Sequence, residues 1–154
     1  GTGFESTHFL SPMKIAGRGG KDLNEAWRDG AEAYLGLAVS GFPNLFMLYG
    51  PNTNLGHNSI LFMFECQTHY VMKCLERMRK NRLASLEPRA ERMREYNERL
   101  QERHEHLVWN AGCSSWYKDE TGKNTNNWPG YTVEYWMRTR RPDFGAFEGA
   151  PRLE

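Results

Sequence analysis

The chain has 154 residues, of which 39% are hydrophobic, and its 20 basic and 19 acidic side chains leave a net charge of +1. This length suits one domain with its own core, and the nearly neutral, interleaved charge excludes a general attraction to nucleic acid or to an anionic membrane. No apolar run approaches the length that crosses a bilayer and no secretory leader is visible, so we expect no membrane partner and a cytoplasmic location.

Residues 1–58 are predicted to form a layer of strands and loops. Glycine clusters come first, followed by a short helix over residues 22–29, for which Asp22 is a suitable N-terminal cap. Apolar runs bounded by turn residues predict buried strands over residues 34–39 and 45–49.

The segment after the second predicted strand reads as a turn followed by a helix start. Gly50 and Pro51 mark the turn, and Asn58 and Ser59 open a long apolar segment as a helix cap does. We expect the intervening loop to present backbone amides without partners and the positive end of a helix dipole, which together favour anionic or electron-rich ligand edges. The alternative is an ordinary turn over residues 52–54 with a simple cap after it.

Residues 59–107 are predicted to hold two long helices. The first, over residues 59–82, is apolar on every side at its start and has fewer apolar residues toward its end. This pattern predicts that the beginning of the helix is buried and that its end reaches solvent. The second has Pro88 in its first turn and runs to residue 107, with Arg and Glu over most of its surface as a solvated face. Its narrow inner stripe consists of Ala90, Met93, Asn97, Leu100 and His104.

Residues 108–154 are predicted to contain short strands, a turn over residues 119–127, a helix over residues 131–140 that ends before Pro142, and an unstructured tail from residue 145 to residue 154. The expected fold class is therefore α+β, with a few short strands, two long helices and a shorter C-terminal helix.

The cysteines and histidines do not form a metal-binding or redox pattern. Cys66, Cys74 and Cys113 contain no Cys-x-x-Cys pair, and their odd number argues against a disulfide framework. Cys66 and Cys74 lie on one face of a predicted helix, where cysteine behaves as a small hydrophobic residue. His104 and His106 diverge on their helix, so we expect no metal site.

Several short motifs follow one another in a fixed order along the chain. They are Gly-Arg-Gly-Gly-Lys-Asp-Leu at residues 17–23, Trp27, Tyr-Leu-Gly at 34–36, Gly-Phe-Pro-Asn at 41–44, Gly-Pro-Asn at 50–52, Cys-Ser-Ser-Trp-Tyr at 113–117, Gly-Lys at 122–123 and Trp-Pro-Gly-Tyr at 128–131. In this order they resemble the last third of the flavin-containing Baeyer-Villiger monooxygenases. Residues 1–4 also resemble that family's Ala-Thr-Gly motif between the FAD and NADPH domains, with Gly1 in place of the alanine.

Two motifs of that family are absent from the sequence. The nearest match to Gly-x-Gly-x-x-Gly has Asp22 at its last position, so the loops that hold the dinucleotide phosphates are expected elsewhere. The family's fingerprint ending in Trp-Pro is missing as well, because Asn124 stands where its histidine would fall. We therefore expect the chain, which opens at Gly1 on a mid-protein motif, to be an inactive piece of a longer enzyme that binds FAD weakly or not at all by itself.

The resemblance implies FAD and NADPH in the full-length enzyme and a set of residues around them. The loop before the first long helix would border the flavin ring, with Leu55 and Ile60 shaping the substrate-facing side. For Trp116, packing in a core or at a partner surface is the alternative, and for His57 a hydrogen-bonding turn. The expected cofactor-binding residues are Thr2, Gly3, Asn52, Thr53, Asn54, Leu55, Gly56, His57, Asn58, Ser59, Trp116 and Lys123.

The implied function is that of an FAD- and NADPH-dependent monooxygenase that inserts oxygen beside a ketone carbonyl. The chain would form the C-terminal portion of the FAD-binding domain and part of the flavin and substrate pocket wall, without a catalytic residue of its own. Its partners would be the rest of the FAD and NADPH domains and a small ketone, and the isolated chain would self-associate. Two alternatives stay open: a related flavin monooxygenase that oxygenates nitrogen or sulfur, and a stand-alone helical interaction module built on the stripe of residues 90–107.

Overall fold

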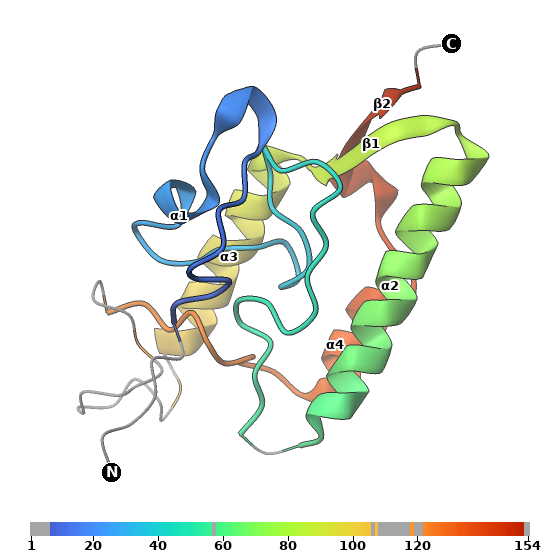
Figure 1. The fold of residues 1–154 in the computed structure, drawn as a ribbon. Helices are drawn as coiled ribbons and strands as arrows, with labels where there is room; N and C mark the ends of the chain where they lie inside the picture. Colours follow the sequence, from blue (N-terminus) through green and yellow to red (C-terminus); the bar gives the residue numbers. More distant parts are fainter. Residues whose placement is uncertain (1–6, 57, 106, 108–117, 119–121, 153–154) are drawn as a thin grey trace.

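The computed structural model describes residues 7–56, 58–105, 107, 118 and 122–152. Figure 1 shows two long helices around central loops, with a two-stranded sheet at one end. None of the helices in the described part combines the length and apolar character that a bilayer span requires. In chain order the elements are η1 (Arg18–Gly20), α1 (Leu23–Ala26), α2 (Ile60–Lys80), β1 (Leu83–Pro88), α3 (Ala90–Glu105), α4 (Thr132–Thr139), η3 (Phe144–Ala146) and β2 (Phe147–Pro151).

Helix α2 forms close to its predicted bounds and contributes buried side chains to two of the hydrophobic clusters. Its buried side chains recur at three- and four-residue steps, as on one face of a helix. The predicted burial of its beginning is wrong for this chain, because Leu61 is 66% exposed. Basic residues in the last turn complement the negative end of the helix dipole. The buried side chains are Met63, Cys66, Gln67, Tyr70 and Cys74.

Helix α3 begins at Ala90, because Pro88 is the last residue of β1 and does not open the helix. The predicted inner stripe is confirmed at Asn97, Leu100 and His104, which are buried. Ala90, at the start of the helix, is exposed and does not belong to it. Asn97 donates from Nδ2 to the Met93 carbonyl oxygen at 2.8 Å. Because this stripe packs inside the chain, it offers no open surface for the interaction module considered above.

Strands β1 and β2 pair antiparallel, from Leu83 opposite Pro151 to Pro88 opposite Phe147. The predicted unstructured tail is therefore wrong. Phe147 is 4% exposed and packs in a cluster with Tyr70 of α2, so tertiary burial fixes a strand that has no local signal of its own. The predicted C-terminal helix is confirmed as α4, which packs beside α2 (Figure 1).

The strands predicted over residues 34–39 and 45–49 do not form. The first range is a tight turn in which Leu35 and Gly36 have φ values of 55° and 68°. The second makes only an isolated bridge to Ala38 among the described residues. These runs are apolar because they fill the core between the helices, and burial alone does not distinguish a strand from a buried turn.

A buried carboxylate joins the first forty residues to the sheet. Glu87 of β1 is 2% exposed, forms an ion pair with Arg18, and accepts a 2.6 Å hydrogen bond from the Gly41 amide. These partners compensate the burial of a charge in the strand.

The two described cysteines are structural. Cys66 and Cys74 are free thiols buried on α2, as predicted, and burial raises the pKa of the Cys74 thiol to about 12. A high pKa suppresses the reactive thiolate. Cys113 lies outside the described residues, and within the described part no three His, Cys, Asp or Glu side chains form a group able to hold a metal ion.

Candidate functional site

The loop that leads into α2 is held by a distant segment of the chain. The Asn52 amide donates to the Thr125 carbonyl at 2.8 Å, and the Asn54 amide donates to the Asn126 carbonyl at 3.0 Å. The Trp128 amide returns a 2.9 Å bond to the carbonyl of Asn54. Residues 52–54 and residues 124–128 thus form a short parallel ribbon. The backbone N–H groups of Asn52 and Asn54, which the sequence predicts to be free for a ligand, are therefore already hydrogen-bonded within the chain.

The Asn52 side chain lies inside this ribbon and is 3% exposed. Its Nδ2 donates to the carbonyl oxygens of Asn124 at 2.6 Å and Asn127 at 3.2 Å. The same nitrogen lies 3.4 Å from Nε2 of His104 on α3. Burial lowers the pKa of His104 to about 4, so the imidazole is neutral and lies beside the Asn52 amide nitrogen without adding a charge there. Asn52 therefore ties the loop, the distant segment and α3 together.

Thr53 and Asn54 are also fixed by local contacts. The Thr53 hydroxyl donates to the Gly50 carbonyl oxygen at 2.8 Å. The Thr53 methyl group occupies the space that a Cβ atom on Gly36 would need. Asn54 accepts a 2.7 Å bond from the Tyr49 hydroxyl at its Oδ1. The loop is therefore held by hydrogen bonds within the chain.

Amides on the other edge of the loop have no acceptor. Within the described part of the chain, the backbone N–H groups of Thr53 and Leu55 make no hydrogen bond, although Thr53 is completely buried. Residues 53 and 55 alternate with residues 52 and 54, so their amides point away from the ribbon. Thr53 is closed to solvent, whereas Leu55 is partly exposed, so a ligand oxygen or ring nitrogen can reach the Leu55 amide.

The start of α2 adds an open positive end beside this edge. The Ser59 side chain makes no capping hydrogen bond, so the first amides of α2 have no side-chain partner there. Asn58 accepts from the Ser59 amide at 2.7 Å and donates from Nδ2 to the Thr132 hydroxyl at 3.0 Å. Asn58 thus fixes the start of α2 against the start of α4 and leaves the helix terminus open.

The residues predicted to face a substrate are partly buried against the core. Leu55 and Ile60 both pack against a cluster that contains Met63 and Trp128. Leu61, which follows Ile60 on α2, is 66% exposed, and Leu48, in the segment before the loop, is 52% exposed. Such a group of exposed apolar side chains marks a surface that fits a ligand or another part of a protein.

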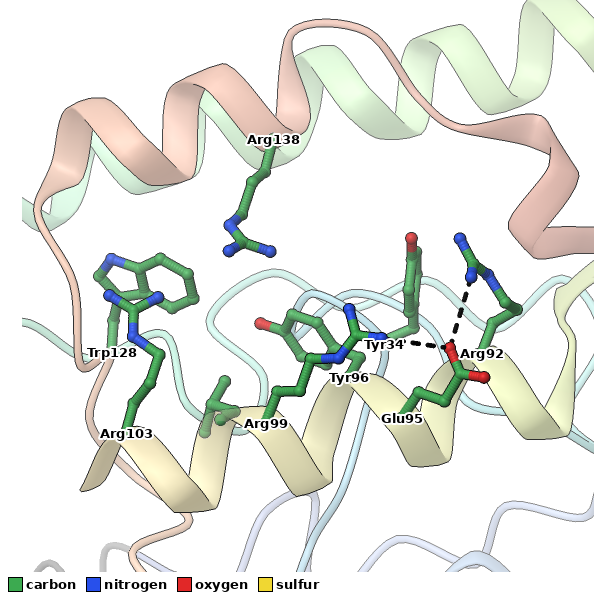
Figure 2. Close-up of a pocket in the computed structure, with 9 residues that line it drawn as sticks. Tyr34, Arg92, Glu95, Tyr96, Arg99, Arg103, Trp128 and Arg138 are labelled. Carbon is green, nitrogen blue, oxygen red and sulfur yellow. Dashed lines mark hydrogen bonds and ion pairs between the residues drawn. The ribbon is translucent and has the colours of Figure 1, made fainter. Parts of the chain in front are cut away.

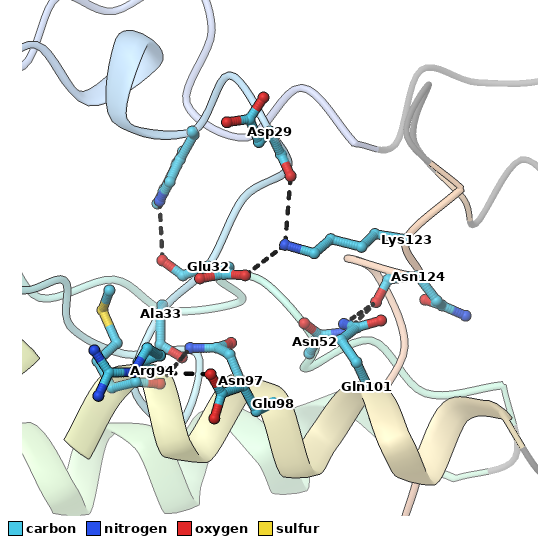
Figure 3. Close-up of polar contacts among 12 residues, drawn as sticks. Asp29, Glu32, Ala33, Asn52, Arg94, Asn97, Glu98, Gln101, Lys123 and Asn124 are labelled. Carbon is cyan, nitrogen blue, oxygen red and sulfur yellow. Dashed lines mark hydrogen bonds and ion pairs between the residues drawn. The ribbon is translucent and has the colours of Figure 1, made fainter. Parts of the chain in front are cut away.

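Lys123 lies away from this loop and has an acidic partner. Figure 3 shows its ammonium between the Glu32 carboxylate, at 2.6 Å, and the Asp29 carbonyl oxygen, at 3.4 Å. Its charge is thus directed at Glu32 in this structure, and its predicted contact with a cofactor phosphate or ribose stays a prediction that requires this pair to open.

The other predicted cofactor residues are only partly covered by the structure. Thr2, Gly3, His57 and Trp116 lie outside the described residues. Gly56 is described and exposed at the end of the loop. The structure therefore brings together Asn52, Thr53, Asn54, Leu55, Gly56, Asn58 and Ser59, and it places Lys123 elsewhere.

Residues that hold the loop in place are missing from the sequence predictions. Asn124 and Asn127 pair with Asn52, and Gln67 of α2 accepts a 2.9 Å hydrogen bond from the Tyr49 amide. One sequence signal for the first two exists, since Asn-Thr-Asn occurs both at residues 52–54 and at residues 124–126. Gln67 carries no such signal, because a polar residue on a helix usually faces solvent.

Comparison of the sequence with curated proteins gives relatives of one kind. The FAD-binding monooxygenase ktnD of Aspergillus niger is 44% identical over 142 residues, which make up 87% of this chain and 23% of that protein. A Baeyer-Villiger monooxygenase of Pseudomonas aeruginosa is also 44% identical, over 96% of this chain and 28% of its own length. The chain thus spans about a quarter of the length of these relatives. No family model matches the sequence.

Solved structures give the same result for the fold. The chain superposes on the enzyme OTEMO, in complex with FAD and NADP, with a TM-score of 0.83 and 25% identity, covering 97% of this chain and 28% of that one. An oxidized steroid monooxygenase bound to NADP gives a TM-score of 0.78 and 26% identity, covering 90% and 27%. By both sequence and fold, the chain belongs to the Baeyer-Villiger monooxygenase family.

Proposed function

We propose that the chain forms part of the flavin and substrate pocket wall in an FAD- and NADPH-dependent monooxygenase of the Baeyer-Villiger type, which inserts oxygen beside a ketone carbonyl. It would be the C-terminal portion of the FAD-binding domain, and the rest of the FAD and NADPH domains would supply the phosphate-binding loops. The names of the relatives support the reaction class, and the fold of NADP-bound neighbours supports both cofactors.

The observation that carries the pocket role is the unbonded, partly exposed amide of Leu55, in the loop that leads into the open N-terminus of α2. A flavin ring presents carbonyl oxygens and a ring nitrogen along its pyrimidine edge, and this edge becomes negative when the ring is reduced. An unpaired amide donor and a positive helix end match that edge in both hydrogen bonding and charge. The residues present thus fit FAD.

The loop would act by holding its donors in place before the cofactor binds. Asn52 fixes the backbone from one side and Thr53 from the other, so little reorganisation is needed when charge develops at the ring. Leu55 and Ile60 would exclude water from the substrate side. FAD supplies the electron transfer and oxygen chemistry when bound, and the chain contributes position and electrostatics.

Two substitutions at one position test this role in the full-length enzyme. Leu55→Pro removes the backbone N–H of residue 55, which makes no hydrogen bond in the structure, so no existing bond is lost. Leu55→Ala shortens the side chain and keeps this N–H. We expect Leu55→Pro to slow flavin reduction by NADPH by about a hundredfold, and Leu55→Ala to slow it by less than tenfold. Gly56→Val, which adds a branched side chain beside the loop, should act in the same direction as Leu55→Pro.

Stopped-flow absorbance of the flavin gives the rates, and the FAD content of each purified variant is measured alongside. Arg94→Ala is the control, because Arg94 is 67% exposed on α3 and pairs only loosely with Glu98, at 3.7 Å. Equal reduction rates and equal FAD content for both Leu55 variants would contradict the proposed role of the loop amides.

A further inference from the structure

A cavity of about 180 Å³ lies between α3 and α4. Its walls carry four arginines, two tyrosines and a tryptophan. Figure 2 shows Arg103 and Trp128 at one end, Arg92 and Glu95 at the other, and Arg138 reaching in from α4. Tyr34 and Tyr96 lie between the two ends in the same view.

The arginines around the cavity outnumber the carboxylates that they contact. Glu134 accepts two hydrogen bonds from Arg103, at 2.7 and 2.8 Å, and another pair from Arg138, at 3.1 and 2.9 Å. At the other end, Glu95 lies between Arg92, at 3.4 Å, and Arg99, at 3.7 Å.

A third carboxylate, Asp143, contacts Arg92 at 3.2 Å. Four guanidinium groups therefore share three carboxylates, which leaves the group with a net charge of +1 although each arginine has a carboxylate contact. Because several of these side chains reach solvent, the surplus charge attracts an anion most strongly at low salt.

Two tyrosine hydroxyls in the cavity wall are also without partners. The Tyr96 hydroxyl is buried and makes no hydrogen bond, and the structure gives none to the Tyr34 hydroxyl either, within the described residues. The two rings meet edge to face with their centroids 5.5 Å apart. Burial raises the pKa of both phenols, so both remain protonated and can donate to an acceptor.

We propose that this cavity is a binding site for a small oxyanion, the carboxylate or phosphate group of a small molecule. Arginine forks and phenol donors are the groups that recognise planar and tetrahedral oxyanions. The Trp128 ring, which has the Arg103 guanidinium 5.7 Å from its centroid, and Leu100 form an apolar wall for the organic part of the ligand. The cavity adjoins the loop that leads into α2 through Trp128, but none of its arginines and tyrosines belongs to that loop, and the inference does not rest on flavin binding.

The test is a calorimetric titration of the full chain at low, matched ionic strength, with inorganic phosphate in one arm and acetate in the other. A saturable isotherm is expected in at least one arm, and the arm that saturates identifies a phosphate or a carboxylate ligand. Tyr96→Phe and Arg138→Gln should each weaken that binding by about tenfold, since each removes a donor to a charged group. Arg94→Gln, an exposed arginine on the same helix that does not line the cavity, should leave it unchanged.

The ligand-free variants provide a second measurement. Because the Tyr96 hydroxyl has no partner, Tyr96→Phe should unfold thermally at the same temperature as the parent chain or higher. A lower unfolding temperature would show that the hydroxyl is already bonded, which would overturn the proposal. Absence of saturation in both arms, or equal affinities for the parent chain and both cavity variants, would overturn it as well.

Discussion

The Tyr135 hydroxyl on α4 donates a 2.7 Å hydrogen bond to the carbonyl oxygen of Leu35, a residue 100 positions earlier in the chain. The same hydroxyl accepts a 3.2 Å hydrogen bond from Nε2 of Gln67 on α2, and both side chains are completely buried. Leu35 has a positive φ of 55°, which is uncommon for a leucine. A backbone conformation of that kind persists where its surroundings fix it, and the Tyr135 hydroxyl is one of the groups that do so.

Removal of this hydroxyl should therefore destabilise the fold. Tyr135→Phe leaves two buried polar atoms without a partner, so we expect a loss of about 2 kcal/mol or more in the free energy of unfolding. Tyr131→Phe is the matched control, because Tyr131 precedes the same helix and is 77% exposed, and it should change the value by less than about 0.5 kcal/mol. Urea unfolding followed by circular dichroism measures both, and equal midpoints would contradict the structural role of Tyr135.

Gly36 should be far less tolerant of a side chain than a second glycine with almost the same backbone angle. Gly36 has a φ of 68°, and a Cβ there would overlap the Thr53 side chain and lie 2.7 Å from the Pro51 carbonyl oxygen. Gly19 has a φ of 66° with no atom nearby. We expect Gly36→Ala to cost about 3 kcal/mol and Gly19→Ala about 1 kcal/mol. Thermal unfolding of both variants tests the difference, and similar losses would show that the contact with Thr53 relaxes easily.

The buried His104 predicts a loss of stability in mild acid. Burial lowers its pKa from 6.5 to about 4 in the folded chain, so between these pH values the unfolded chain binds a proton that the folded chain excludes. The free energy of unfolding should therefore fall as the pH drops through this window, by about 3 kcal/mol in total from this residue. Above pH 6.5 the residue should cause no pH dependence. Urea unfolding from pH 7.5 to pH 4 should show a shallower slope for His104→Gln, and parallel slopes would assign the acid sensitivity to other groups.

The exposed apolar side chains near the start of α2 predict self-association of the isolated chain. Leu61 lies one helical turn before Phe64, whose ring packs edge to face against Tyr49 with centroids 5.9 Å apart. Leu61→Glu should reduce the apparent molecular mass in light scattering, because a charge at this exposed apolar position opposes the association of two chains. Met72→Glu, at a site that is 52% exposed further along α2, is the control and should have little effect. A parent chain that stays monomeric at all concentrations would contradict this prediction.

The helices could be predicted because their signals are local. Asp22 caps α1 as its residue type predicts, with Oδ1 accepting from the Glu25 amide at 3.1 Å. The apolar spacing on α2 and Pro142 after α4 place two further helices within a few residues of their bounds. Each of these signals lies inside or next to the helix that it defines.

The sheet and the central turns could not be predicted in this way. Strand β1 contains a buried Glu87 and ends at Pro88, and its partner β2 reads as a polar tail, so both depend on contacts far apart in the sequence. At the loop before α2, Gly50 and Pro51 indicate the turn correctly. They cannot indicate that Asn52 and Asn54 donate their amides to another segment, because that contact exists only after the chain has folded.

The ribbon between residues 52–54 and residues 124–128 has a consequence for how ligands affect the protein. Because the two segments share backbone hydrogen bonds, a molecule that immobilises one of them also restricts the other. The conformational entropy lost in ordering the second segment is then already paid when another ligand arrives, and its affinity rises without any change of shape. Two binding events on opposite edges of this ribbon would therefore be positively cooperative.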